Sequence, residues 1–126
     1  MFLKTAALCL LVVASAPASY LDDIGYTDLQ TNLGAGTPTG AGVTVSQIEA
    51  KENGINYLPN TTIPEFAGKT FTTKSAASDP SGHATLVGQY YYGAESSTAR
   101  GVTTIDNYEA GDWPTRKYAS TTYWVT

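Results

Sequence analysis

The chain has 126 residues, with seven Lys and Arg against eleven Asp and Glu, one histidine and one cysteine. This length accommodates one domain at most, and the lack of a basic run argues against nucleic acid as a partner. One histidine and one cysteine leave zinc without a ligand set, whereas calcium held by carboxylates and carbonyls stays open, although no EF-hand spacing occurs. Abundant Tyr, Gly, Thr and Ser favour an exported α/β or β-rich protein.

The first 18 residues have the pattern of a signal peptide. Lys4 provides a positive start, Thr5–Ala14 an apolar run, and Ala16–Ala18 a small-residue cleavage site. We expect cleavage after Ala18, which makes the protein secreted, periplasmic or attached to the cell surface, with no remaining membrane span. An uncleaved anchor is the alternative, but the run is shorter than the ~20 residues that a span needs. Residues 19–126 contain no cysteine, so no disulfide can form there.

The amino-terminal half of this region predicts one helix and one strand. We expect a short helix from Thr27 to Leu33, closed by Gly34, and then a flexible glycine-rich loop up to Gly42. Phosphate-binding glycine loops follow a strand and open a helix, whereas this loop precedes a strand, so a nucleotide site is not expected. The strand is Val43–Glu49, which is rich in β-branched residues and ends at a carboxylate.

The second half predicts a central helix. Ser81 is placed to cap it, His83 lies in its first turn, and Gly93 stands where a glycine would end it. One face of this helix consists of residues at helical spacing: Ala84, Val87, Gly88 and Tyr91. The positive end of the helix dipole disfavours a charged imidazole, which suits a proton acceptor. The alternative is that His83 is an ordinary, partly exposed polar residue.

A shorter apolar piece at Phe66–Thr72 precedes this helix, and a strand candidate at Gly101–Glu109 follows it. The larger residues of that candidate strand are Val102, Ile105 and Tyr108. Strand, loop, helix and strand in this order predict a βαβ unit with a parallel sheet. Glu49 and His83 would then meet at the carboxyl edge of the sheet, where the acid could fix the tautomer of a ring that takes a proton from a serine.

Four segments resemble the family of subtilisin-like serine peptidases. Gly42–Glu49 resembles the strand that ends at the catalytic acid of that family, and Pro64–Phe71 resembles the segment between its first two motifs. Gly82–Gly88 is similar to the histidine motif His-Gly-Thr-x-Val-Ala-Gly, and Gly101–Ala110 to the strand that follows it. The likeness covers about residues 40–110.

The resemblance implies an α/β fold, a partial subtilisin-like parallel sheet with flanking helices, in which residues 19–126 form the amino-terminal portion of the domain. It assigns His83 as general base and acid and Glu49 as its orienting carboxylate, in the order acid, histidine, serine. It implies a peptide or protein substrate and no cofactor. Calcium stays open, because members of the family bind it, but the sequence identifies no site for it.

The sequence also departs from the family pattern. Glu49 replaces an aspartate, Ala50 and Lys51 replace the small residues that usually follow it, and Ala84 replaces a glycine beside the histidine. Gly88 stays glycine, which predicts close packing of the helix unless the residue is simply tolerated. No Gly-Thr-Ser motif for the nucleophile and no oxyanion asparagine segment occur, and residues 112–126 match no part of the family pattern.

These observations leave three functional hypotheses. The first is that the chain is a serine peptidase homologue that is truncated before its nucleophile and inactive as given, or a pseudoenzyme of that family. The second hypothesis is a non-catalytic secreted binding or surface module with a degenerate fold of this type, in which tyrosines make the contacts. The third is a small secreted domain unrelated to the family.

Overall fold

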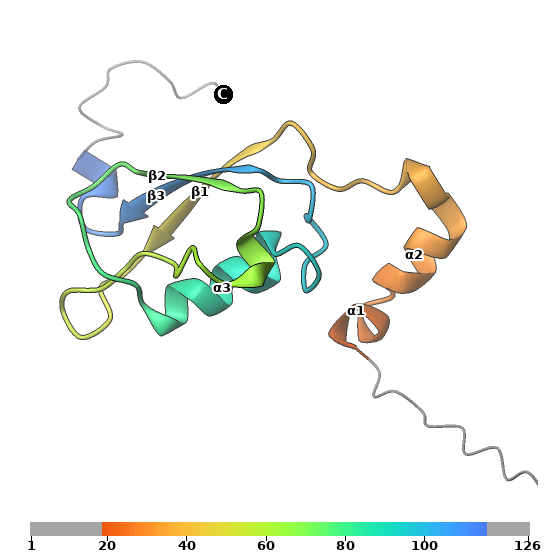
Figure 1. Cartoon of the computed structure of the whole chain (residues 1–126), viewed down its shortest axis with the longest axis horizontal. Coiled ribbons are helices and arrows are strands. Elements are labelled where there is room, and N and C mark those ends of the chain that lie inside the picture. Colours follow the sequence, from red (N-terminus) through yellow and green to blue (C-terminus); the bar gives the residue numbers. More distant parts are fainter. Residues whose placement is uncertain (1–18, 116–126) are drawn as a thin grey trace, which may run out of the picture.

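The computed structural model describes residues 19–115 and shows an α/β arrangement of a three-stranded parallel sheet with flanking helices (Figure 1). The elements are α1 (Tyr20–Asp23), α2 (Tyr26–Leu33), β1 (Thr44–Glu49), β2 (Thr70–Thr73), α3 (Gly82–Tyr92) and β3 (Thr104–Glu109), with single 3₁₀ turns at Gly34–Gly36 and Pro64–Phe66. The predicted signal peptide lies outside the described residues, as does most of the segment 112–126.

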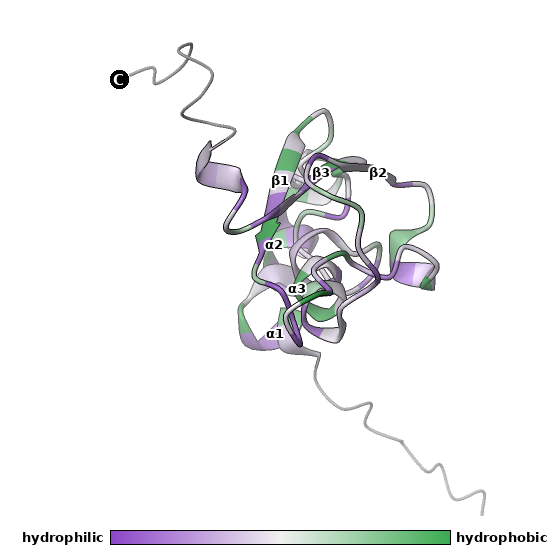
Figure 2. Ribbon diagram, turned by 90° about the vertical axis from the view of Figure 1, so that its left-hand side faces the viewer, coloured by the Kyte–Doolittle hydropathy of each residue, from purple (hydrophilic) through white to green (hydrophobic). Residues whose placement is uncertain are grey.

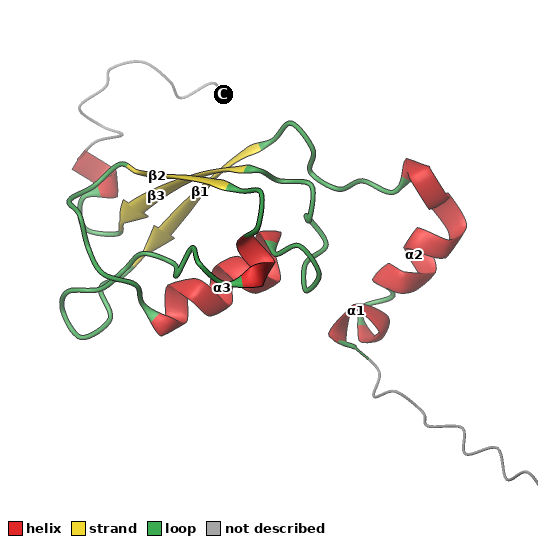
Figure 3. Cartoon of the chain, in the orientation of Figure 1, coloured by secondary structure: helices red, strands yellow, loops and turns green. Residues whose placement is uncertain are grey.

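The sheet has the order β1-β3-β2, so the last strand in the chain lies in the middle. All of β1 pairs with β3, from Thr44 opposite Thr104 to Glu49 opposite Glu109. β2 pairs with the other edge of β3, from Thr70 opposite Thr104 to Thr73 opposite Asn107. Helix α3 covers one face of the sheet, and no described helix covers the other (Figure 3). The predicted βαβ arrangement with a parallel sheet is therefore confirmed.

Several element boundaries differ from the predicted ones. The third strand begins only at Thr104, because Ala99–Val102 forms a turn in which the Val102 N–H donates to the Ala99 carbonyl at 3.0 Å. Phe66 lies in a 3₁₀ turn, so the apolar piece becomes a strand only from Thr70 onward. Helix α1 was not predicted; at its start the Asp22 carboxylate accepts a hydrogen bond from the Ser19 backbone N–H at 2.8 Å.

The core lies between α3 and the sheet. Its fully buried side chains are Phe66, Tyr92, Val102 and Ile105. The Phe66 ring stands 5.4 Å from the Tyr92 ring and 5.3 Å from the Phe71 ring, within the range of favourable aromatic pairs. Figure 2 shows both hydrophobic and hydrophilic segments along β1, but the buried positions of this strand are the polar Gln47 and Glu49, whereas Ile48 is exposed.

Two tyrosines dock the amino-terminal helices onto the rest of the molecule. The Tyr26 hydroxyl donates to the Thr98 carbonyl at 2.9 Å, and the Arg100 guanidinium lies 5.7 Å from the centre of the Tyr26 ring. The Tyr20 ring meets Tyr90 edge to face at 5.2 Å. Within residues 19–115, no helix is both long enough and apolar enough to cross a bilayer.

Candidate active site

The candidate site forms where β1 ends and α3 begins. Glu49 is the last residue of β1, and His83 is the second residue of α3. The helix starts there because the Ser81 side chain accepts a hydrogen bond from the Ala84 N–H at 3.1 Å, which confirms the predicted cap. The carboxyl end of the strand and the amino end of the helix therefore bring both predicted site residues to one edge of the sheet.

The two side chains face each other. His83 Nε2 lies 3.4 Å from Glu49 Oε2, with the imidazole 66% exposed and the carboxylate only 9% exposed. This separation allows an ion pair but exceeds the ~2.7–3.2 Å of a strong N–H···O hydrogen bond. Because Nε2 faces the acid, Nδ1 is the ring nitrogen that remains for a second proton partner.

Gln47 holds the carboxylate of Glu49 in place. Both residues lie on the helix-facing side of β1, and Gln47 Nε2 donates to Glu49 Oε1 at 2.9 Å and to the Ala84 carbonyl at 2.8 Å. The Tyr92 hydroxyl donates to Gln47 Oε1. The Gln47 amide thus links the strand to both ends of α3, and the carboxylate that faces His83 has little freedom to rotate.

Tyr92 is the buried end of this network. Burial, and secondly the negative charge of Glu49, raise the pKa of the Tyr92 hydroxyl well above its ordinary value of 10.0. Its proton is therefore held over the neutral range and is available for the bond to Gln47. The hydroxyl acts on Glu49 only through Gln47, as a positioning group.

A second carboxylate stands at the start of α3. Glu52 Oε2 accepts from the Gly82 N–H at 2.8 Å and lies 3.5 Å from the His83 N–H. A hydrogen bond with the Ser81 side chain, followed by the bond from the His83 backbone, lowers the pKa of the exposed Glu52 carboxyl. Negative charge at the positive end of a helix is favourable, so Glu52 stabilises the turn that carries His83.

Beyond His83, the outer face of α3 is apolar and exposed. His83 borders a shallow hollow of about 370 Å³ lined by Leu86, Val87, Tyr90 and Tyr91. Of these, Tyr91 is 59% exposed and Leu86 is 51% exposed. The imidazole thus lies between a buried acid on one side and an accessible hydrophobic surface on the other.

Two positions of the histidine motif, Ala84 and Gly88, have different structural roles. The side chain of Ala84 is fully buried, and its carbonyl receives the Gln47 amide. A Cβ on Gly88 would lie 2.5 Å from the Tyr92 hydroxyl oxygen and 3.0 Å from Phe66 Cζ. The structure therefore shows the close packing that was predicted from the glycine at position 88.

Within residues 19–115, no group of three or more His, Cys, Asp or Glu side chains could hold a metal ion. Sequence reasoning named His83 and Glu49 but missed Gln47, Glu52 and Tyr92. Gln47 could have been found, because it lies two residues before Glu49 on a strand and shares its face. The contacts of Glu52 and Tyr92 depend on the folded chain and leave no local signal.

No family model, curated protein or solved structure matches the chain.

Proposed function

We propose that this chain carries the acid and histidine of a subtilisin-like serine peptidase site, with Glu49 in the place of the family's aspartate. The observation that supports it is the 3.4 Å approach of Glu49 Oε2 and His83 Nε2 across the strand end and the helix start. The four segments that resemble the family motifs give the pair its context. The reaction class is hydrolysis of peptide bonds in an exported protein.

In this proposal Glu49 fixes the tautomer of the ring. A carboxylate beside Nε2 favours the proton on that nitrogen and leaves Nδ1 bare to accept a proton from a hydroxyl nucleophile. In the usual serine triad the acid faces Nδ1 and the serine faces Nε2, so the two nitrogens exchange roles here. Among residues 19–115 no serine hydroxyl is hydrogen-bonded to the His83 ring, and the proposal places the nucleophile outside this region.

The test uses the protein from its natural source. An antibody against the folded region would isolate the native polypeptide, whose intact mass and reaction with a fluorophosphonate are then measured. We expect a polypeptide that is labelled at a serine when it is folded, and that is not labelled when it is unfolded by heat before the probe is added. When that full polypeptide is produced with substitutions, His83→Ala should lower kcat by about 10⁶-fold and Glu49→Gln by about 10⁴-fold, as the corresponding substitutions in serine triads do.

The matched control for these variants is Asp106→Asn, which changes an acid on the opposite face of the sheet and should leave turnover unchanged. Peptide hydrolysis that survives His83→Ala would contradict the proposal. An unlabelled native polypeptide would contradict it as well.

A second candidate function is a non-catalytic binding module. The observation that favours it is the exposed apolar face of α3, with Leu86, Tyr90 and Tyr91 each at least 49% exposed. Aromatic and aliphatic groups gathered on one surface are typical of protein contacts. A native polypeptide that reacts with no fluorophosphonate, and whose self-association or partner binding is lost in Tyr91→Ser but kept in His83→Ala, would favour this candidate.

A further inference from the structure

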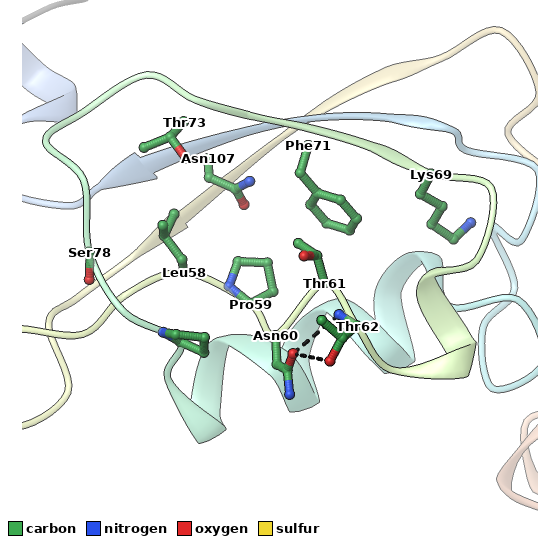
Figure 4. Close-up of a pocket in the computed structure, with 11 residues that line it drawn as sticks. Leu58, Pro59, Asn60, Thr61, Thr62, Lys69, Phe71, Thr73, Ser78 and Asn107 are labelled. Atoms are coloured by element: carbon green, nitrogen blue, oxygen red, sulfur yellow. Dashed lines mark hydrogen bonds between the residues drawn. The ribbon is translucent and has the colours of Figure 1, made fainter.

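A cavity of about 580 Å³ lies apart from the Glu49 and His83 pair, and neither residue lines it. It opens between strand β2 and the loop of residues 58–62, with β3 behind it (Figure 4). Its buried walls include Pro59 and Asn107, while Thr61 and Thr73 stand at its exposed rim. Its volume falls within the ~300–1,000 Å³ of ordinary small-molecule sites.

The inner wall contains a polar atom without a partner. Asn107 is only 2% exposed and lies on the central strand, on the same face as the buried Ile105. Its Oδ1 is shielded from solvent and accepts no hydrogen bond from the described residues. Buried polar side chains in native proteins are nearly always hydrogen-bonded, so this orphan acceptor on a cavity-lining residue indicates a place for a ligand donor, which reaches Oδ1 once the Asn107 amide turns toward the cavity.

The charges around the cavity limit what can enter. No carboxylate lines it, and its single cation is Lys69. The Lys69 ammonium already donates to the Arg100 carbonyl at 3.1 Å and to the Val102 carbonyl at 2.7 Å, and burial lowers its pKa. The cavity therefore offers no free charge to pair with an ionised ligand, and burying an unpaired charge there would be unfavourable.

The remaining lining combines apolar surfaces with hydroxyl groups. The Phe71 ring and the Pro59 ring present apolar surfaces, and the rim carries the hydroxyls of Thr61 and Thr73 (Figure 4). A ligand with hydroxyl or amide donors on one side and C–H groups on the other would match both surfaces. Neutral sugar rings and small amides have this chemistry.

We propose that this cavity binds a small uncharged ligand that carries hydroxyl or amide N–H donors beside an apolar face, with Asn107 Oδ1 as the specific acceptor. Donors on the ligand satisfy Asn107 and the rim hydroxyls, and its apolar face lies against Phe71. This binding is independent of hydrolysis at the candidate active site.

The test is an NMR titration of the purified protein with three neutral probes: glucose, N-acetylglucosamine and acetamide. We expect at least one of them, at millimolar concentration, to shift the side-chain amide signals of Asn107 and to give nuclear Overhauser effects to the Phe71 ring. Binding of glucose but not acetamide would show that the ligand's donors are hydroxyl groups. Binding of acetamide but not glucose would show that they are amide N–H groups. The charged analogues glucosamine and glucuronate should bind at least about tenfold more weakly than the neutral sugars.

Two variants complete the experiment. Asn107→Leu removes the acceptor while filling similar space, and it should weaken binding by about tenfold or more. Asp106→Asn changes the neighbouring residue on the opposite face of the sheet and should bind as the parent does. No shift with any probe, or unchanged affinity in a folded Asn107→Leu protein, would overturn the proposal. If Asn107→Leu fails to fold, the absence of contacts to Phe71 in the parent protein would overturn it equally.

Discussion

Replacing Gly88 by alanine tests how α3 packs against the core. An added Cβ would lie 2.5 Å from the Tyr92 hydroxyl oxygen and 2.8 Å from Tyr92 Cζ, closer than real Cβ atoms come to such neighbours, and 3.0 Å from Phe66 Cζ, which is a tight contact. The tyrosine ring must move, and its hydroxyl then leaves Gln47 Oε1. The substitution therefore perturbs the core and the site network together.

The magnitude follows from three opposing contributions. Alanine in a helix interior is favoured over glycine by about 1 kcal/mol. Overpacking of a filled core costs about 1–3 kcal/mol, and a buried acceptor left without its donor costs about 1–3 kcal/mol. We expect Gly88→Ala to lower the free energy of unfolding by about 1–5 kcal/mol, despite its better helix propensity.

The assay is urea unfolding followed by circular dichroism, with Gly82→Ala as the matched control. A Cβ on Gly82, in the first turn of the same helix, meets only Glu52 carboxylate oxygens at 3.9 Å. That variant should differ from the parent by about 0.5 kcal/mol or less. A Gly88→Ala protein as stable as the parent, or more stable, would refute the reasoning, because the lost packing and hydrogen bonding would then cost no more than the roughly 1 kcal/mol that alanine gains in a helix.

Two further predictions concern the same helix. Ser81→Ala removes the side chain that accepts from the Ala84 N–H, and it should lower the free energy of unfolding by about 1 kcal/mol in the same urea assay; Ser46→Ala, on an exposed strand position, should leave it unchanged. Burial, and secondly Glu49, raise the pKa of Tyr92 above 10.0. The contribution of this hydroxyl to the free energy of unfolding should therefore be fully present below pH 10 and should be lost as the pH rises beyond it, because the unfolded chain releases this proton first. Tyr92→Phe should remove that contribution to the alkaline loss, and an unchanged alkaline melting profile in the variant would contradict this cause.

The sequence predicted the elements whose signals are local. The β-branched run of β1 and the Ser81 cap of α3 specify their structures within a few residues, and both occur where they were expected. The convergence of Glu49 and His83 followed from the order of strand and helix, because parallel strands place their carboxyl ends at one edge. What these residues do chemically stays a prediction.

Other features depend on contacts that no local pattern carries. The larger residues of the third strand candidate, Val102, Ile105 and Tyr108, do not share one face of a strand, and alternation places Ile105 on the same face as Asn107. A buried asparagine in a central strand contradicts the usual apolar pattern and gives no hint of the cavity that it lines. The Gln47 bond to Tyr92 joins residues 45 positions apart, so only the folded chain reveals it.

The central claim is that Glu49 orients the ring of His83, and ring ¹⁵N NMR tests it most directly. In alkaline solution, where a free imidazole is neutral, long-range ¹H–¹⁵N correlations report which nitrogen carries the proton. We predict the proton on Nε2 in the parent protein and a mixture of tautomers in a folded Glu49→Leu variant. A proton on Nδ1 in the parent, or identical spectra in the two proteins, would contradict the account.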